Sequence, residues 1–98
     1  MADKFLKKLH IWEQKLKENL TFPFTAKVID SDRKFPHRIG QKLTVLNILS
    51  CDDLYGIFLS CRIGRKKHSI PFCNITPQDT ESMNYPLVKG YVEWFDNR

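Results

Sequence analysis

The segment from residue 30 to 41, DSDRKFPHRIGQ, combines residues with opposite preferences for a metal ion. Asp30 and Asp32 have the one-and-three spacing of a loop that wraps a hard cation such as calcium. Basic residues that should repel a cation follow at once: Arg33, Lys34, His37 and Arg38. From its residue types, the segment could hold a metal, bind an anion or simply join two strands.

Comparison with the calcium loop of an EF-hand tests whether the segment could hold a metal in that way. Such a loop needs oxygen ligands at its first, third, fifth and twelfth positions and glycine at its sixth. Here the fifth position is Lys34, the sixth is Phe35 and the twelfth is Gln41. An EF-hand is therefore excluded, and we expect a connector between strands with a partial set of oxygen ligands.

The basic residues offer a second kind of chemistry. The net charge is +5, and residues 76–98 alone carry more acidic than basic side chains. Two basic clusters, if they are neighbours, would form one surface for phosphates or for an acidic protein. Its members are Arg33, Lys34, Arg38, Arg65, Lys66 and Lys67. The alternative is that the RKK turn is only a solvated surface.

Features of an enzyme or a membrane protein are missing from the sequence. The three histidines are scattered, and no Ser or Cys stands in a nucleophile motif. Cys51, Cys61 and Cys73 form neither a disulfide framework nor a CxxC pair for zinc. There is no apolar run long enough to cross a bilayer, and the charged N-terminus does not look like a secretion signal. We therefore expect a non-enzymatic, cytoplasmic protein without membrane contacts.

Hydrophobic periodicity predicts the elements that must position these residues. Apolar residues three or four apart indicate an amphipathic helix over residues 1–20. Alternating or continuous apolar runs, separated by turns, predict four strands, at residues 22–30, 41–49, 55–63 and 67–72. A polar connection over 73–84 leads to a C-terminal helix over 85–95, with Pro86 in its first turn.

These elements predict one α+β domain over residues 1–98, with an antiparallel sheet or barrel over 22–75. A few short antiparallel strands need a cover on one face, and the two terminal helices supply it. Trp12, Trp94 and Phe95 are expected to be the largest contributors to the core.

Four stretches resemble one small bacterial protein family, the calcium-binding family of the CcbP type. They are FPFTAKVI, IGQKLTVLNI, DDLYGIFLSCRIGRKKHSIPFCNI and NYPLVKGYVEWFDNR, which together run from Phe22 to Arg98. Trp12 fits the leading helix of that family. The resemblance implies a strongly bent antiparallel sheet, or a small Src-homology-type β-barrel, of four to five strands.

The resemblance also implies calcium, bound by clustered carboxylates outside an EF-hand. Asp52 with Asp53 and Asp79 with Glu81 are the first candidates, and Asp30 with Asp32 are the second. Two such turns brought together could form a shallow site, with Asn74, Asn84 or backbone carbonyl groups as further ligands. The alternatives are a turn held by side-chain-to-backbone bonds at residues 52–53 and a solvated loop at 79–81. If calcium binding has been lost, a basic module for an acidic protein or nucleic acid remains.

Overall fold

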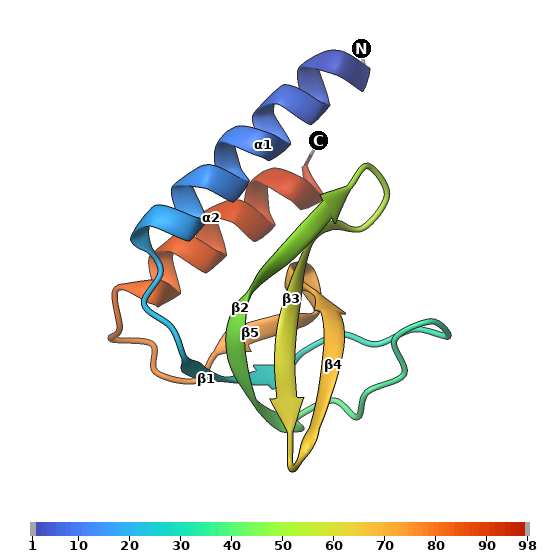
Figure 1. Cartoon of the computed structure of the whole chain (residues 1–98), viewed down its shortest axis with the longest axis vertical. Coiled ribbons are helices and arrows are strands. Elements are labelled where there is room, and N and C mark those ends of the chain that lie inside the picture. Colours follow the sequence, from blue (N-terminus) through green and yellow to red (C-terminus); the bar gives the residue numbers. More distant parts are fainter. Residues whose placement is uncertain (1, 98) are drawn as a thin grey trace.

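The computed structural model describes residues 2–97 as two helices packed on a five-stranded antiparallel sheet (Figure 1). Residues 1 and 98 of the predicted domain lie outside the described residues. This arrangement confirms the predicted α+β class, with a helix at each end of the chain. The elements are α1 (Ala2–Asn19), β1 (Phe24–Val28), β2 (Lys42–Asp52), β3 (Gly56–Ile63), β4 (Lys66–Pro71), the 3₁₀ turn η1 (Phe72–Asn74), β5 (Ile75–Pro77) and α2 (Asn84–Asp96).

The sheet is open, because its strand order β4-β3-β2-β1-β5 leaves β4 and β5 at opposite edges. Of the two predicted forms, the structure therefore has the bent sheet and not a closed barrel. The fifth strand falls where we expected only a polar connection: Val28 pairs with Ile75, and Ala26 pairs with Pro77. This pairing brings the segment that follows β5 next to β1.

Strand β2 contains two irregularities that change which side chains face the helices. Its register with β3 shifts between Val45 and Asn47 and again between Ile48 and Ser50. Each shift adds one residue to β2, as in a β-bulge, and so reverses the alternation of its side chains. The continuous apolar run within residues 41–49 suggested a strand buried on both faces. Because of the shifts, its neighbouring side chains differ in burial: Ile48 is buried and Leu49 is 50% exposed.

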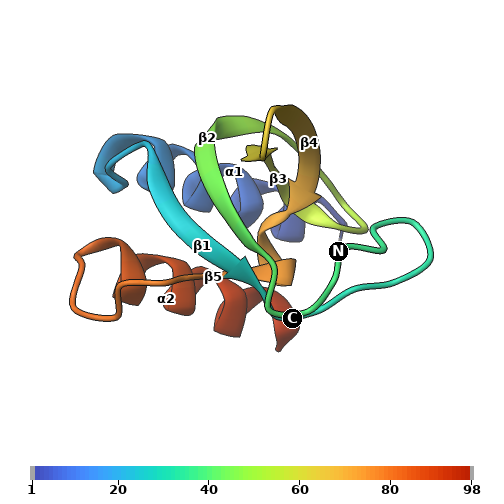
Figure 2. The ribbon, with the colours of Figure 1, turned by 90° about the horizontal axis from the view of Figure 1, so that it is seen from below.

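The core lies between the sheet and the two helices, which cover the same side of the sheet (Figure 2). Leu9 and Leu16 are fully buried on α1, as the helical stripe predicted. On α2 the largest fully buried side chain is Tyr91, whereas Trp12 and Trp94 pack at the margin of the core. No helix within residues 2–97 is long and apolar enough to cross a membrane.

Candidate metal sites

The two carboxylate pairs that the sequence favoured lie in different turns. Asp52 and Asp53 stand at the β2–β3 turn, whereas Asp79 and Glu81 stand in the β5–α2 connection, at the opposite end of the molecule (Figure 1). Within residues 2–97, no three carboxylates from these pairs come close enough to share one ion. The structure therefore does not unite the two turns in one site.

At the β2–β3 turn, one carboxylate is engaged by its own backbone. Oδ1 of Asp52 accepts hydrogen bonds from the N–H groups of Leu54 at 2.9 Å and Tyr55 at 2.6 Å. This is the turn with side-chain-to-backbone bonds that the sequence left open as an alternative. A cation also lies nearby, since Nζ of Lys34 is 5.4 Å from the ring centre of Tyr55.

Asp30 and Asp32 serve the loop that joins β1 to β2. Oδ1 of Asp32 accepts hydrogen bonds from the N–H groups of Lys34 at 2.9 Å and Phe35 at 2.8 Å. Phe35 packs edge-on against Tyr55 of the β2–β3 turn, with ring centres 5.4 Å apart, and against Phe58 of β3 at 5.7 Å, and these contacts hold the loop on the sheet. The segment is thus the connector that we expected, and its acidic start shapes the loop.

The β5–α2 connection differs, because it borders a surface hollow of about 430 Å³. Oxygen-bearing side chains line much of it, namely Thr25, Gln78, Asp79, Ser82 and Asn84. Oδ1 of Asp79 accepts a hydrogen bond from the N–H of Glu81 at 3.0 Å, which curls the loop and holds both acids on it. The amide of Asn84 is not available as a ligand, because it makes hydrogen bonds of 2.9 Å and 3.0 Å with the backbone of Thr21.

The chain segment that borders this hollow is mainly acidic. Between residues 76 and 97 the only basic side chain is Lys89, whose ammonium group lies 5.9 Å from the ring centre of Tyr85. Neither Asp79 nor Glu81 takes part in an ion pair among residues 2–97. The Asp79 loop, residues 78–82, therefore carries no basic side chain of its own, and Lys27 of β1 stands opposite Thr76 just before it.

A protein-family model described as calcium binding, of the CcbP type, matches residues 4–95. The chain belongs to the CcbP calcium-binding family. Its fold is similar to the crystal structure of Anabaena CcbP, with a TM-score of 0.70, 20% identity, and coverage of 88% of this chain and 72% of that one. At this level of identity the likeness shows the fold alone. No curated protein matches the chain.

The oxygen donors of the Asp79 loop fit the ion that the CcbP family implies. Calcium prefers carboxylate, amide, hydroxyl and carbonyl oxygens and fills the rest of its coordination shell with water. Asp79, Gln78 and Ser82 line the hollow with one charged and two neutral side chains, and Glu81 lies on the same loop. With so few protein carboxylates, this CcbP-family chain would hold calcium in an open and largely hydrated site.

One histidine contact joins the basic loop before β2 to strand β4 in this CcbP-family chain. His37, in the loop before β2, packs edge-on against His68 of β4, with ring centres 5.1 Å apart. Burial lowers the pKa of His37, and repulsion from His68 lowers it further. The contact places His37 and the adjoining Arg38 beside β4, whose first residues are Lys66 and Lys67, whereas Lys34 lies over Tyr55 at the β2–β3 turn.

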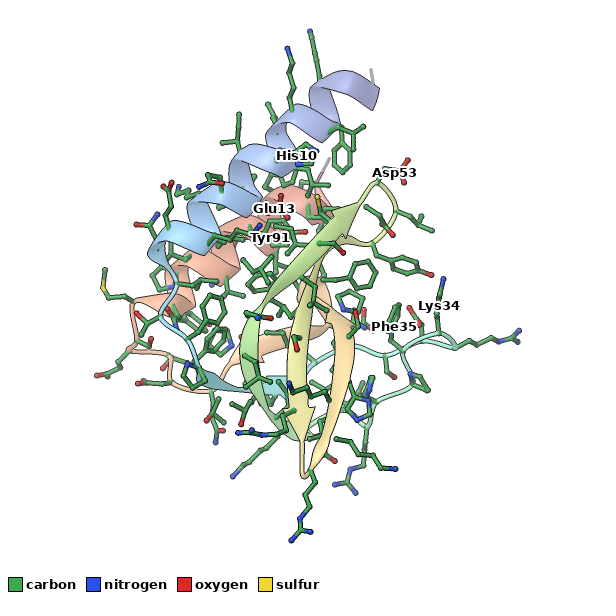
Figure 3. All side chains as sticks on the ribbon, in the orientation of Figure 1. His10, Glu13, Lys34, Phe35, Asp53 and Tyr91 are labelled. Atoms are coloured by element: carbon green, nitrogen blue, oxygen red, sulfur yellow. The ribbon has the colours of Figure 1, made fainter. Side chains whose placement is uncertain are left out.

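A different set of side chains, which the sequence reasoning missed, does gather in one place. His10 and Glu13 of α1 and Cys51 of β2 have ligand atoms that all lie within 4.8 Å of one another. In Figure 3, His10 and Glu13 project from α1 toward the end of β2. Burial raises the pKa of the Cys51 thiol, as does the neighbouring Glu13 carboxylate. The His-x-x-Glu spacing on a predicted helix was the only signal in the sequence, and it did not indicate Cys51.

Proposed function

We propose that this CcbP-family protein binds calcium at the Asp79 loop, as a non-enzymatic calcium-binding protein. Asp79 and Glu81 would supply the charged oxygens, and Gln78 and Ser82 the neutral ones. The observation that carries the proposal is the oxygen-lined hollow beside Asp79. Neither acid of this loop forms an ion pair among residues 2–97, and the competing turn at Asp52 carries the Lys34 ammonium group over its Tyr55 ring.

The small number of charged ligands sets the expected affinity. Calcium sites tighten as carboxylates are added and as the loop becomes more rigid, and weak sites have dissociation constants of about 10⁻⁴ to 10⁻³ M. Two carboxylates on one exposed loop place this site at the weak end. The net charge of +5 lowers the affinity further at low ionic strength, because it repels the ion over a long range.

Isothermal titration calorimetry of three proteins tests this site: the wild type and the variants Asp79→Asn and Asp53→Asn. Asp79→Asn removes a charge but keeps an oxygen that can accept the Glu81 N–H bond, so the loop should keep its shape. We expect its calcium affinity to fall by about tenfold, equivalent to about 1.4 kcal/mol. Asp53→Asn makes the same change at the other turn and should leave the affinity unchanged.

The opposite outcome, a loss of affinity in Asp53→Asn alone, would place the ion at the β2–β3 turn. Absence of any calcium-dependent heat at millimolar calcium in the wild type would remove the calcium function altogether. Either result would leave the family membership and the fold unaffected.

The His37–His68 contact favours a second candidate function, in which the basic surface binds an acidic protein or nucleic acid. The contact holds His37 and the adjoining Arg38 against β4, the strand that begins with Lys66 and Lys67. Phosphate or carboxylate partners gain affinity from such a surface through counterion release and electrostatic steering.

Binding to the basic surface should weaken steeply with added salt. A fluorescently labelled polyanion, such as a short single-stranded oligonucleotide, can be titrated against the double variant Lys66→Glu/Lys67→Glu. We expect this variant to bind at least about tenfold more weakly than the wild type. The control Lys7→Glu/Lys8→Glu changes the net charge equally on exposed positions of α1. An equal loss in both variants would show attraction by net charge and no specific surface.

A further inference from the structure

We propose that His10, Glu13 and Cys51 form a second metal site, distinct from the calcium loop and suited to zinc. The three side chains offer one nitrogen, one oxygen and one sulfur ligand. Imidazole and thiolate are ligands of zinc and related transition metals, whereas calcium takes oxygen almost exclusively. The donor set therefore selects a different class of cation from the Asp79 loop.

Two of the three distances between ligand atoms match the edges of a tetrahedral zinc site, and the third, between Glu13 and Cys51, is within 4.8 Å. Nδ1 of His10 lies 3.4 Å from Oε1 of Glu13 and 3.8 Å from Sγ of Cys51. With zinc bonds of about 2.1 Å to nitrogen and oxygen and about 2.3 Å to sulfur, tetrahedral angles give edges of about 3.4 Å and about 3.6 Å. An ion can therefore enter among the three atoms with only small movements of the side chains.

The fold explains how residues 41 positions apart in the chain meet there. His10 and Glu13 are three residues apart on α1 and so share one face of the helix. The register shift between Ile48 and Ser50 reverses the alternation of β2. Because of that shift, Cys51 points to the same face as the buried Ile48, toward α1, in place of Ser50.

The charges of the site are also suited to a divalent ion. Glu13 and a Cys51 thiolate would together neutralise zinc, and the proton displaced from the thiol passes to solvent. The second oxygen of Glu13 lies 3.7 Å from Nζ of Lys17, so the lysine orients the carboxylate while Oε1 faces His10. The side chain of His10 is 65% exposed, which leaves the fourth tetrahedral position open to water.

Cobalt and zinc titrations of the untagged protein test the site. With one equivalent of Co²⁺, the wild type should show the charge-transfer absorption of a cobalt–thiolate bond, and Cys51→Ser should not. In a zinc competition assay with a chromogenic chelator, His10→Gln and Glu13→Gln should each bind Zn²⁺ about 100-fold more weakly than the wild type. Millimolar calcium should displace neither metal.

Two control variants test whether a cysteine or histidine outside the cluster binds the metal instead. Cys73→Ser and His68→Gln change a cysteine and a histidine outside the cluster, and we expect both to bind like the wild type. Lack of a thiolate band in the wild type, or its persistence in Cys51→Ser, would overturn the proposal. Loss of the band in Cys73→Ser would do the same, because it would move the thiolate ligand elsewhere. Circular dichroism of each variant should show unchanged helix content.

Discussion

A single buried hydroxyl, that of Tyr91, joins the C-terminal helix to the sheet. The side chain is fully buried, and its hydroxyl oxygen accepts a hydrogen bond from the N–H of Ile57 at 2.9 Å. The oxygen also lies against Gly56, whose φ of 77° is a conformation that favours glycine. A Cβ at position 56 would collide with this hydroxyl and with the ring of Phe95, so Gly56 and Tyr91 fit only as a pair.

Replacement of Tyr91 by Phe should destabilise the fold by about 1–3 kcal/mol, because the buried N–H of Ile57 loses its acceptor. The free energy of unfolding, measured by urea denaturation, checks this value. Tyr85→Phe is the control, since Tyr85 is only half-buried at the start of α2. Equal stability of the two variants would contradict the role assigned to the Tyr91 hydroxyl.

At the scale of the elements, the sequence allowed most of the fold to be predicted, because periodicity depends on local burial. The stripe containing Leu9 and Leu16 and the alternation over β3 appear in the structure where we expected them. β5 was missed because it has only three residues and ends in Pro77, so it has no periodicity to detect. The register shifts in β2 also escaped prediction, since a bulge is defined by the partner strand.

The loop before β2 should loosen in acid. The pKa of His37 is lowered in the folded state, first by burial and then by His68. Below its ordinary pKa of about 6.5, the unfolded chain therefore takes up a proton that the folded chain resists, and stability falls as the pH falls through this window. Urea denaturation and amide hydrogen exchange of residues 30–41, compared between neutral pH and about pH 5, would measure the effect.

His37→Gln removes the titrating group and should abolish this part of the pH dependence. His68→Gln should reduce it, because it removes the neighbouring charge but not the burial. A pH dependence that is the same in all three proteins would show that the acid sensitivity originates elsewhere.

At the scale of the whole molecule, the sites depend on contacts between residues distant in sequence. The acids of the Asp79 loop could be found from the sequence, but the hollow beside them could not, because β1 supplies Thr25 to its wall. The same holds for Cys51, which meets His10 only because β2 ends against α1. The turn with Asp52 and Asp53 does not join the turn with Asp79 and Glu81 in one site, because the fold places these turns far apart (Figure 1).

Because the two proposed sites share no residue, their effects on stability should add. A ligand that binds only the folded chain stabilises it by RT ln(1 + [L]/Kd), or about 1.4 kcal/mol at ten times the dissociation constant. Calcium and zinc, each at that concentration, should therefore raise the free energy of unfolding by about 2.8 kcal/mol together. Urea denaturation with each ion alone and with both measures this sum. Asp79→Asn should reduce only the calcium part and Cys51→Ser only the zinc part, whereas mutual displacement of the ions would mean that they compete for one site.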